Sequence, residues 1–128
     1  MSEIITDKLT GKTSAGDVTI TSEGGSATMQ LQQGVAKAWA FTTADGQTIN
    51  DSFNVSTLVD NGVGIHTIEY TNNMNNALYS GTMSAESSSD ANTQWMENIA
   101  TTGIQARHYD GSGYQDIPTM WQIMGDLA

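Results

Sequence analysis

The sequence contains no cysteine and only 4 basic residues. The absence of cysteine excludes a disulfide framework, a thiolate nucleophile and a cysteine-rich zinc site. The 4 basic residues stand against 14 acidic ones, and the resulting net charge of −10 repels nucleic-acid phosphates and anionic lipid headgroups. We therefore expect neither a nucleic-acid partner nor a membrane partner.

Long apolar runs are also absent, since none approaches the ~20 residues that a membrane-spanning helix needs. The first eight residues, Met1 to Lys8, do not form a basic region followed by an apolar stretch, so we expect no signal peptide. Charged residues and proline are scarce, whereas 3 Trp, 4 Tyr and 2 Phe are present. This composition is typical of a folded chain, and 128 residues are enough for one core.

Polar and apolar residues alternate along many short segments, as half-buried strands require. Residues 17–21 and 28–32 alternate in this way, and the glycines between them predict a hairpin. Asp60-Asn61-Gly62 predicts a second tight turn, and residues 85–92 have the composition of a loop. Further strands are expected at 35–41, 51–55, 65–71, 78–84, 104–109 and 118–124.

Short strands separated by turns, without an amphipathic helical pattern, predict an all-β fold. We expect an antiparallel β-sandwich of the jelly-roll or Ig-like type over residues 34–128. Residues 1–33 are expected to form an N-terminal β arm that docks on a neighbouring molecule, because their apolar side chains are small.

Several large apolar residues are candidates for the core or for a subunit interface. In residues 35–41, Val35, Trp39 and Phe41 share one side of the expected strand and three alanines share the other. The small side chains would allow another element to approach closely. The full set of core or oligomer-interface candidates is Trp39, Phe41, Phe53, Trp121 and Met124.

Three other aromatic residues, Trp95, Tyr109 and Tyr114, have two interpretations. Flat aromatic faces stack on sugar rings, so the three are candidates for contact with a host receptor or glycan. Packing in a core or an interface is the commoner use of such residues, and both interpretations stay open.

No catalytic or metal-binding motif is visible. His66 and His108 have no further ligand or base at a recognisable spacing, and protonation near an unperturbed pKa of ~6.5 is their main route to making an interface pH-sensitive. Residues 110–116 resemble part of a calcium loop but lack the other acids, which favours a plain turn. We expect no enzymatic activity, no cofactor and no metal.

Residues 34–124 resemble a pattern found in phage tail-fibre and related virion proteins. The pattern has a Lys-Ala-Trp strand (37–39), a Ser-Phe-Asn-Val-Ser segment (52–56) and an Asp-Asn-Gly-x-Gly turn (60–64). It continues with a strand reaching Met74 and with an Ala-x-Tyr strand start at 77–79. The resemblance implies a compact β domain on symmetric, often trimeric, fibres or knobs, and no catalytic residues.

We therefore expect a bacteriophage virion structural protein of the tail-fibre or capsid-decoration type, located at the particle surface. Only 33 residues precede the matching part, which favours a small knob, adaptor or decoration protein over a whole fibre. Its expected partners are copies of itself, as a homotrimer, and other capsid, tail or fibre proteins. The alternative is a carbohydrate- or host-receptor-binding module at a fibre tip.

Overall fold

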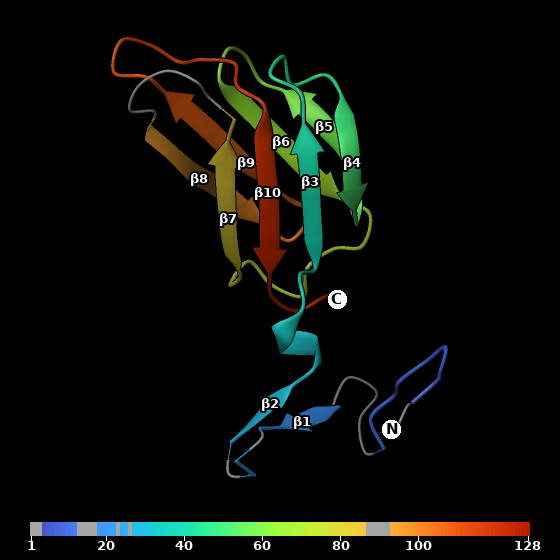
Figure 1. The fold of residues 1–128 in the computed structure, drawn as a ribbon. Coiled ribbons are helices and arrows are strands. Elements are labelled where there is room, and N and C mark those ends of the chain that lie inside the picture. The colour runs from blue at the N-terminus through green and yellow to red at the C-terminus, as the bar shows by residue number, and fades with distance from the viewer. Residues whose placement is uncertain (1–3, 13–17, 23, 26, 87–92) are drawn as a thin grey trace. The chain divides into compact units, whose positions relative to one another are not determined.

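A computed structural model describes residues 4–12, 18–22, 24–25, 27–86 and 93–128 (Figure 1). The chain divides into two compact units, residues 1–35 and 36–128, and each is described by itself. Part of the first predicted turn (residues 23 and 26) and most of the predicted loop at 85–92 (residues 87–92) lie outside the described residues.

The first unit contains a short hairpin. Strands β1 (Thr19–Thr21) and β2 (Thr28–Gln30) pair antiparallel with Ile20 opposite Met29, and a 3-10 turn, η1 (Gln32–Gly34), follows. None of the described residues of this unit is buried. Backbone hydrogen bonds therefore hold the hairpin with little help from apolar packing, which is a marginal arrangement in water.

The second unit is an antiparallel β-sandwich, which confirms the predicted fold class. Its first sheet has the strand order β4-β3-β10-β7, and its second has the order β5-β6-β9-β8 (Figure 1). No helix in the described parts of the chain is long and apolar enough to cross a bilayer. The strands are β3 (Ala38–Thr42), β4 (Ile49–Phe53), β5 (Val55–Asp60), β6 (Ile65–Tyr70), β7 (Ser80–Ala85), β8 (Thr93–Ala100), β9 (Gly103–Tyr109) and β10 (Thr119–Met124).

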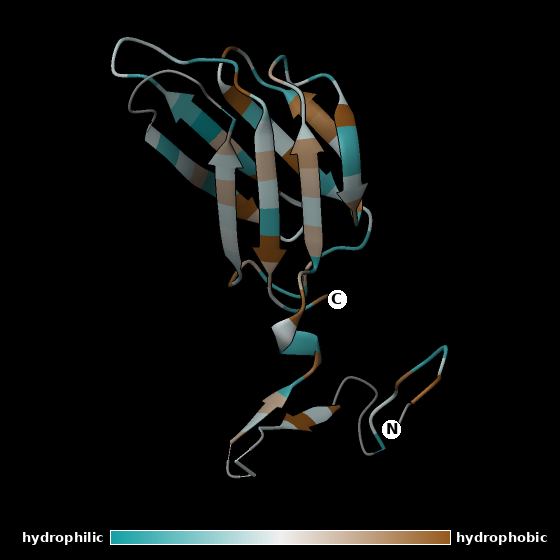
Figure 2. Cartoon of the chain, viewed as in Figure 1, coloured by the Kyte–Doolittle hydropathy of each residue, from teal (hydrophilic) through white to brown (hydrophobic). Residues whose placement is uncertain are grey.

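The core lies between the two sheets and is built from alternate residues of the inner strands. Figure 2 shows hydrophilic and hydrophobic residues succeeding one another along these strands. Small residues of β3 and large residues of β10 face aliphatic and aromatic residues of β6 and β9, with Met74 beside them. The buried cluster is Ala38, Ala40, Ile68, Tyr70, Met74, Ile104, Ala106, Trp121 and Ile123.

The predicted strand at 51–55 is in fact two strands that belong to different sheets. Asn54 separates them with a φ of 57°, a left-handed conformation that asparagine tolerates better than most residues. Its side-chain amide donates to the Lys37 carbonyl at 2.9 Å, and its Oδ1 accepts the Asn72 N–H at 2.7 Å. Asn54 thus fixes the corner where the chain crosses from the first sheet to the second.

Strand β8 is absent from the sequence-based prediction. Its sequence does not alternate strictly, and its pairing with β9 shifts register between Glu97 and Ala100, where Asn98 takes a φ of 49°. Such a bulge interrupts the period-two pattern on which the prediction depended.

Candidate functional site

The outer face of the first sheet carries an apolar patch, which we call the apolar face. It consists of Trp39, Phe41, Phe53, Met120 and Met124. Trp39 lies opposite Phe53 across the β3–β4 ladder, and Phe41 lies opposite Met120 across the β3–β10 ladder. Met124, also from β10, has the same parity as Met120. The structure therefore brings four of the five predicted core or interface residues onto one surface, together with Met120.

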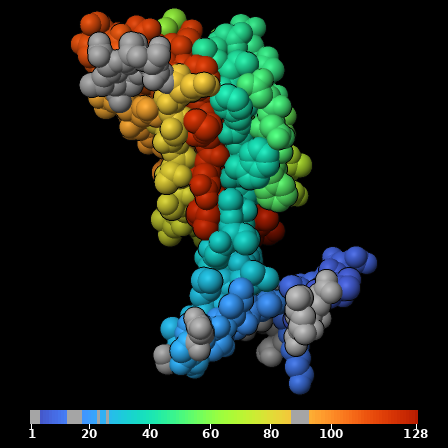
Figure 3. All heavy atoms as spheres, in the orientation of Figure 1, coloured from blue at the N-terminus to red at the C-terminus, as the bar shows by residue number. Residues whose placement is uncertain are grey.

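Three of these large apolar side chains are exposed, and Phe41 and Met124 are partly buried. Trp39 is 38% exposed, Met120 45% and Phe53 51%. Figure 3 shows this side of the sandwich, and a shallow hollow of about 220 Å³ lies where Thr82, Ser84 and Met120 meet. Exposed apolar surface of this kind marks interaction sites more often than isolated exposed residues do.

Trp121, the fifth predicted residue, has the opposite orientation. It is 2% exposed and belongs to the buried cluster. Its indole Nε1–H donates to Thr42 Oγ1 at 3.2 Å, so the polar atom of this buried ring has a partner. Trp121 is a core residue.

The three aromatic residues considered for receptor contact come together at the outer face of the second sheet. The rings of Tyr109 and Tyr114 meet edge-on with centroids 5.7 Å apart, and the rings of Trp95 and Tyr114 are 6.3 Å apart. Tyr114 is the most exposed, at 39%. We call Trp95, Tyr109 and Tyr114 the aromatic cluster.

An ion pair accompanies the aromatic cluster and was not predicted. Arg107 Nε donates to Glu97 Oε1, while Arg107 Nη1 donates to the Tyr114 hydroxyl at 3.1 Å. The Arg107 guanidinium also lies 5.5 Å from the centre of the Tyr114 ring, in cation–π range. Hydrogen bonds from Arg107 and then from Trp95 lower the pKa of Glu97. No sequence signal joins these residues, because the pairing of β8 with β9 brings them together.

The loop between β9 and β10 presents Tyr114. Asp110 Oδ1 accepts the N–H groups of Ser112 and Gly113 at 2.8 and 2.9 Å, and Asp110 Oδ2 accepts an amide proton from Gln115. These backbone hydrogen bonds lower the pKa of Asp110. The described residues contain no group of three metal-ligating side chains, and Asp110 serves as a turn cap.

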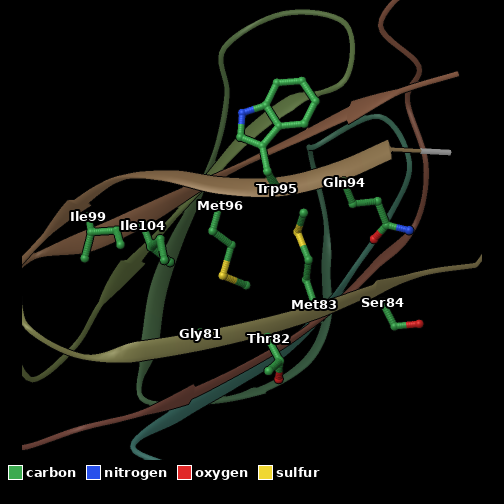
Figure 4. A pocket seen from close by; sticks show the side chains of 9 residues that line it. All are labelled: Gly81, Thr82, Met83, Ser84, Gln94, Trp95, Met96, Ile99 and Ile104. Atoms are coloured by element: carbon green, nitrogen blue, oxygen red, sulfur yellow. The ribbon is translucent and has the colours of Figure 1, made fainter. Parts of the chain in front are cut away.

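A cavity of about 690 Å³ lies between the edge strands β7 and β8 (Figure 4). Met83 and Met96 point toward one another across it, whereas the Trp95 ring points away. No acidic or basic side chain is among its described lining, so it lacks the convergent ionisable groups of a catalytic cleft. The lining residues are Gly81, Thr82, Met83, Ser84, Gln94, Trp95, Met96, Ile99 and Ile104.

Both histidines are fully buried at the end of the sandwich where the β9–β10 loop begins. The rings of His66 (β6) and His108 (β9) have centroids 6.5 Å apart. Three ring nitrogens, Nδ1 and Nε2 of His66 and Nδ1 of His108, have no hydrogen-bond partner among the described residues. Asp116 Oδ1 lies 3.6 Å from His66 Nε2. The shared parity of His66 with Ile68 and Tyr70 signals this burial in the sequence.

Searches for similarity with protein-family models, curated proteins and solved structures found no match to this chain.

Proposed function

We propose that this chain is a non-enzymatic structural component of a bacteriophage virion that assembles with copies of itself through the apolar face. The observation that carries the self-association is the surface exposure of Trp39, Phe53 and Met120 on one side of the sandwich. Burying such side chains against a second molecule removes apolar area from water and stabilises the complex. The assignment to a virion rests on the resemblance of residues 34–124 to tail-fibre and related proteins.

The charge distribution favours a second copy as the occupant of the apolar face. The whole chain carries −10, so two copies repel one another over most orientations. Among the described strand residues of this outer face, Asp51 is the one charged side chain. Two copies that meet through this face therefore place few like charges close together. A closed symmetric oligomer satisfies every copy equally, and a trimer is the state that the resemblance favours.

Light scattering coupled to size-exclusion chromatography tests self-association. The wild-type chain is expected to show a multiple of its 13.6 kDa monomer mass at micromolar concentration. A Trp39→Ser/Phe53→Ser variant is expected to elute as a folded monomer. Tyr114→Ala is the matched control, because it removes an exposed aromatic ring from the loop between β9 and β10, away from the apolar face. A monomeric wild-type chain would refute the proposed assembly.

Immunogold labelling of intact phage particles tests the assignment to a virion. Antibodies against the chain are expected to decorate particles at regular positions on the head, the tail or the fibres. Particles that remain unlabelled, while the same antibodies bind the free protein, would count against a surface location.

The second candidate function is recognition of a host-surface carbohydrate by the aromatic cluster. The specific observation in its favour is that Tyr114 is solvent-exposed beside the paired side chains of Arg107 and Glu97. An exposed ring offers a stacking surface, and the ion pair supplies donors and acceptors for sugar hydroxyls.

A glycan array tests carbohydrate recognition. Binding is expected to fall at least tenfold in Tyr114→Ala and to persist in Phe53→Ser, which alters only the other sheet. Binding that persists in Tyr114→Ala, or no binding by the wild-type chain to host polysaccharide, would remove this candidate.

A further inference from the structure

The end of the sandwich that carries the aromatic cluster also contains the two buried histidines. The β9–β10 loop connects these features, because it contains Tyr114 and Asp116. Tyr114 belongs to the aromatic cluster, and Asp116 lies beside His66. Only two peptide bonds therefore separate Tyr114 from the residue whose carboxylate lies beside His66.

Four contacts connect this loop, the turn between β5 and β6, and the strands that carry the histidines. The Gly64 N–H donates to Asp116 Oδ1 at 2.6 Å, and the His108 N–H donates to the Gly64 carbonyl at 3.0 Å. The Gln115 N–H donates to the His108 carbonyl at 3.2 Å, and Asp116 Oδ1 also lies 3.6 Å from His66 Nε2. Gly64, with a φ of 67°, leaves no space for a β-carbon beside Gln115. The loop thus closes directly over the histidine pair.

The hydrogen bonds around His108 assign its neutral tautomer. The Thr119 hydroxyl donates its proton to the Ile117 carbonyl at 3.0 Å, so its oxygen accepts from His108 Nε2–H at 2.9 Å. His108 Nδ1 then carries a lone pair, and no described group donates to it. A proton added in acid enters a buried position that offers no acceptor.

The charged groups that face the pair come from two loops. Asp116 belongs to the β9–β10 loop, and Asp45 belongs to the turn between β3 and β4, where Gly46 packs on the His66 ring. The adjoining strands β3 and β10 contribute the uncharged Thr42 and Thr119. Burial, followed by the neighbouring His66, lowers the pKa of His108 to about 4, and Asp116 opposes this shift.

Charging His108 therefore favours conformations that admit water. Strands β6 and β9 are each hydrogen-bonded on both sides, so they separate only at high cost. The β9–β10 loop has exposed residues on both sides of Tyr114 and leaves more readily. We propose that protonation of His108 releases residues 110–117 and moves Tyr114 away from Trp95 and Tyr109. If the aromatic cluster binds carbohydrate as proposed, this release makes recognition pH-dependent.

A pH titration of the full, 15N-labelled chain by NMR tests the release. The amide signals of Gly64, Gly113 and Gln115 are expected to shift or broaden with a common midpoint between pH 4 and 6.5. Those of Ile104 and Ile123 are expected to stay unchanged over that range. Loop signals that stay fixed while the His108 imidazole signals titrate would overturn the proposal.

Two variants separate His108 from other acid-sensitive groups. His108→Gln retains an amide donor for Thr119 and does not titrate, so the loop transition is expected to disappear. Asp116→Asn retains an acceptor for the Gly64 N–H but removes the charge that opposes the His108 shift, so the midpoint is expected to fall. A transition that survives unchanged in both variants would contradict the assignment. Because no ligand is used, loop release and carbohydrate binding succeed or fail independently.

Discussion

The two outer faces of the sandwich are both formed by antiparallel strands but differ in the polarity of their side chains. On the second sheet, Asn98 donates to Gln105 at 2.9 Å, and both Gln105 and Asn61 donate to Thr67 Oγ1. On the first sheet, Trp39 and Phe53 occupy equivalent outward positions. Antiparallel sheets commonly keep one face polar, so the second sheet is the ordinary case. This contrast is the observation on which the proposed assembly through the apolar face depends.

The largest effect on stability is expected when substitutions on the two faces of one strand, β10, are compared. Trp121→Ala removes a buried indole and is expected to lower the free energy of unfolding by about 3–5 kcal/mol. Met120→Ala, one residue away on the apolar face, is expected to cost less than about 1 kcal/mol. Urea denaturation measures both values. Equal losses in the two variants would mean that both faces of the first sheet are packed within one molecule.

Acidification is expected to have the next largest effect, and it acts on the inner face of the second sheet. Because the pKa of His108 is lowered from 6.5 to about 4 in the folded state, the unfolded chain binds more protons between these values. The stabilisation is complete above pH 6.5 and is lost as the pH falls toward 4, by up to about 3 kcal/mol.

Denaturation at pH 7 and at pH 4.5 measures this loss. His108→Gln is the control, since it retains the other acid-sensitive groups and removes one imidazole. A wild-type chain and a variant with the same pH dependence would show that His108 contributes nothing to acid sensitivity.

A smaller effect is expected for the polar network of the second sheet. Gln105→Ala removes the hydrogen bonds to Asn98 and Thr67 and is expected to cost about 1 kcal/mol. The mass of the assembly is expected to stay unchanged, because Gln105 belongs to the second sheet and not to the apolar face. Thermal unfolding and light scattering measure the two quantities. If the assembly dissociates in Gln105→Ala, the contact surface would lie on the second sheet, which contradicts the proposed assembly.

The smallest effect on stability is expected on the apolar face. Phe53→Ser is expected to change the unfolding free energy of the monomer by no more than about 0.5 kcal/mol, because this side chain is already half exposed. Denaturation at a concentration where the chain is monomeric measures this value. A loss of several kcal/mol would show that Phe53 packs within its own molecule.

The sequence predicts the sandwich well because alternation and turn chemistry are local signals. The Asp60-Asn61-Gly62 turn connects β5 and β6 as expected, with the Ile65 N–H donating to the Gly62 carbonyl. The corner at Asn54 is also local, but asparagine occurs in many loops and does not by itself break a strand. The sequence therefore indicated one strand there where the structure has two.

The orientation of β3 is harder to predict than its existence. Hydrophobicity alone would turn Trp39 and Phe41 inward, yet Ala38 and Ala40 line the core. The same buried cluster contains the bulky Ile68 from the opposite sheet. Which face of a strand is buried thus depends on residues distant in the sequence, as does the meeting of Arg107 with Glu97.

Hydroxyl-radical footprinting at low and high protein concentration tests the central claim most directly, because oxidation reports the solvent exposure of each side chain. As the chain associates, Trp39, Phe53 and Met120 are expected to become protected, while Tyr114 keeps its reactivity. Unchanged reactivity at the first three residues in the associated state, or protection centred on Tyr114, would contradict assembly through the apolar face.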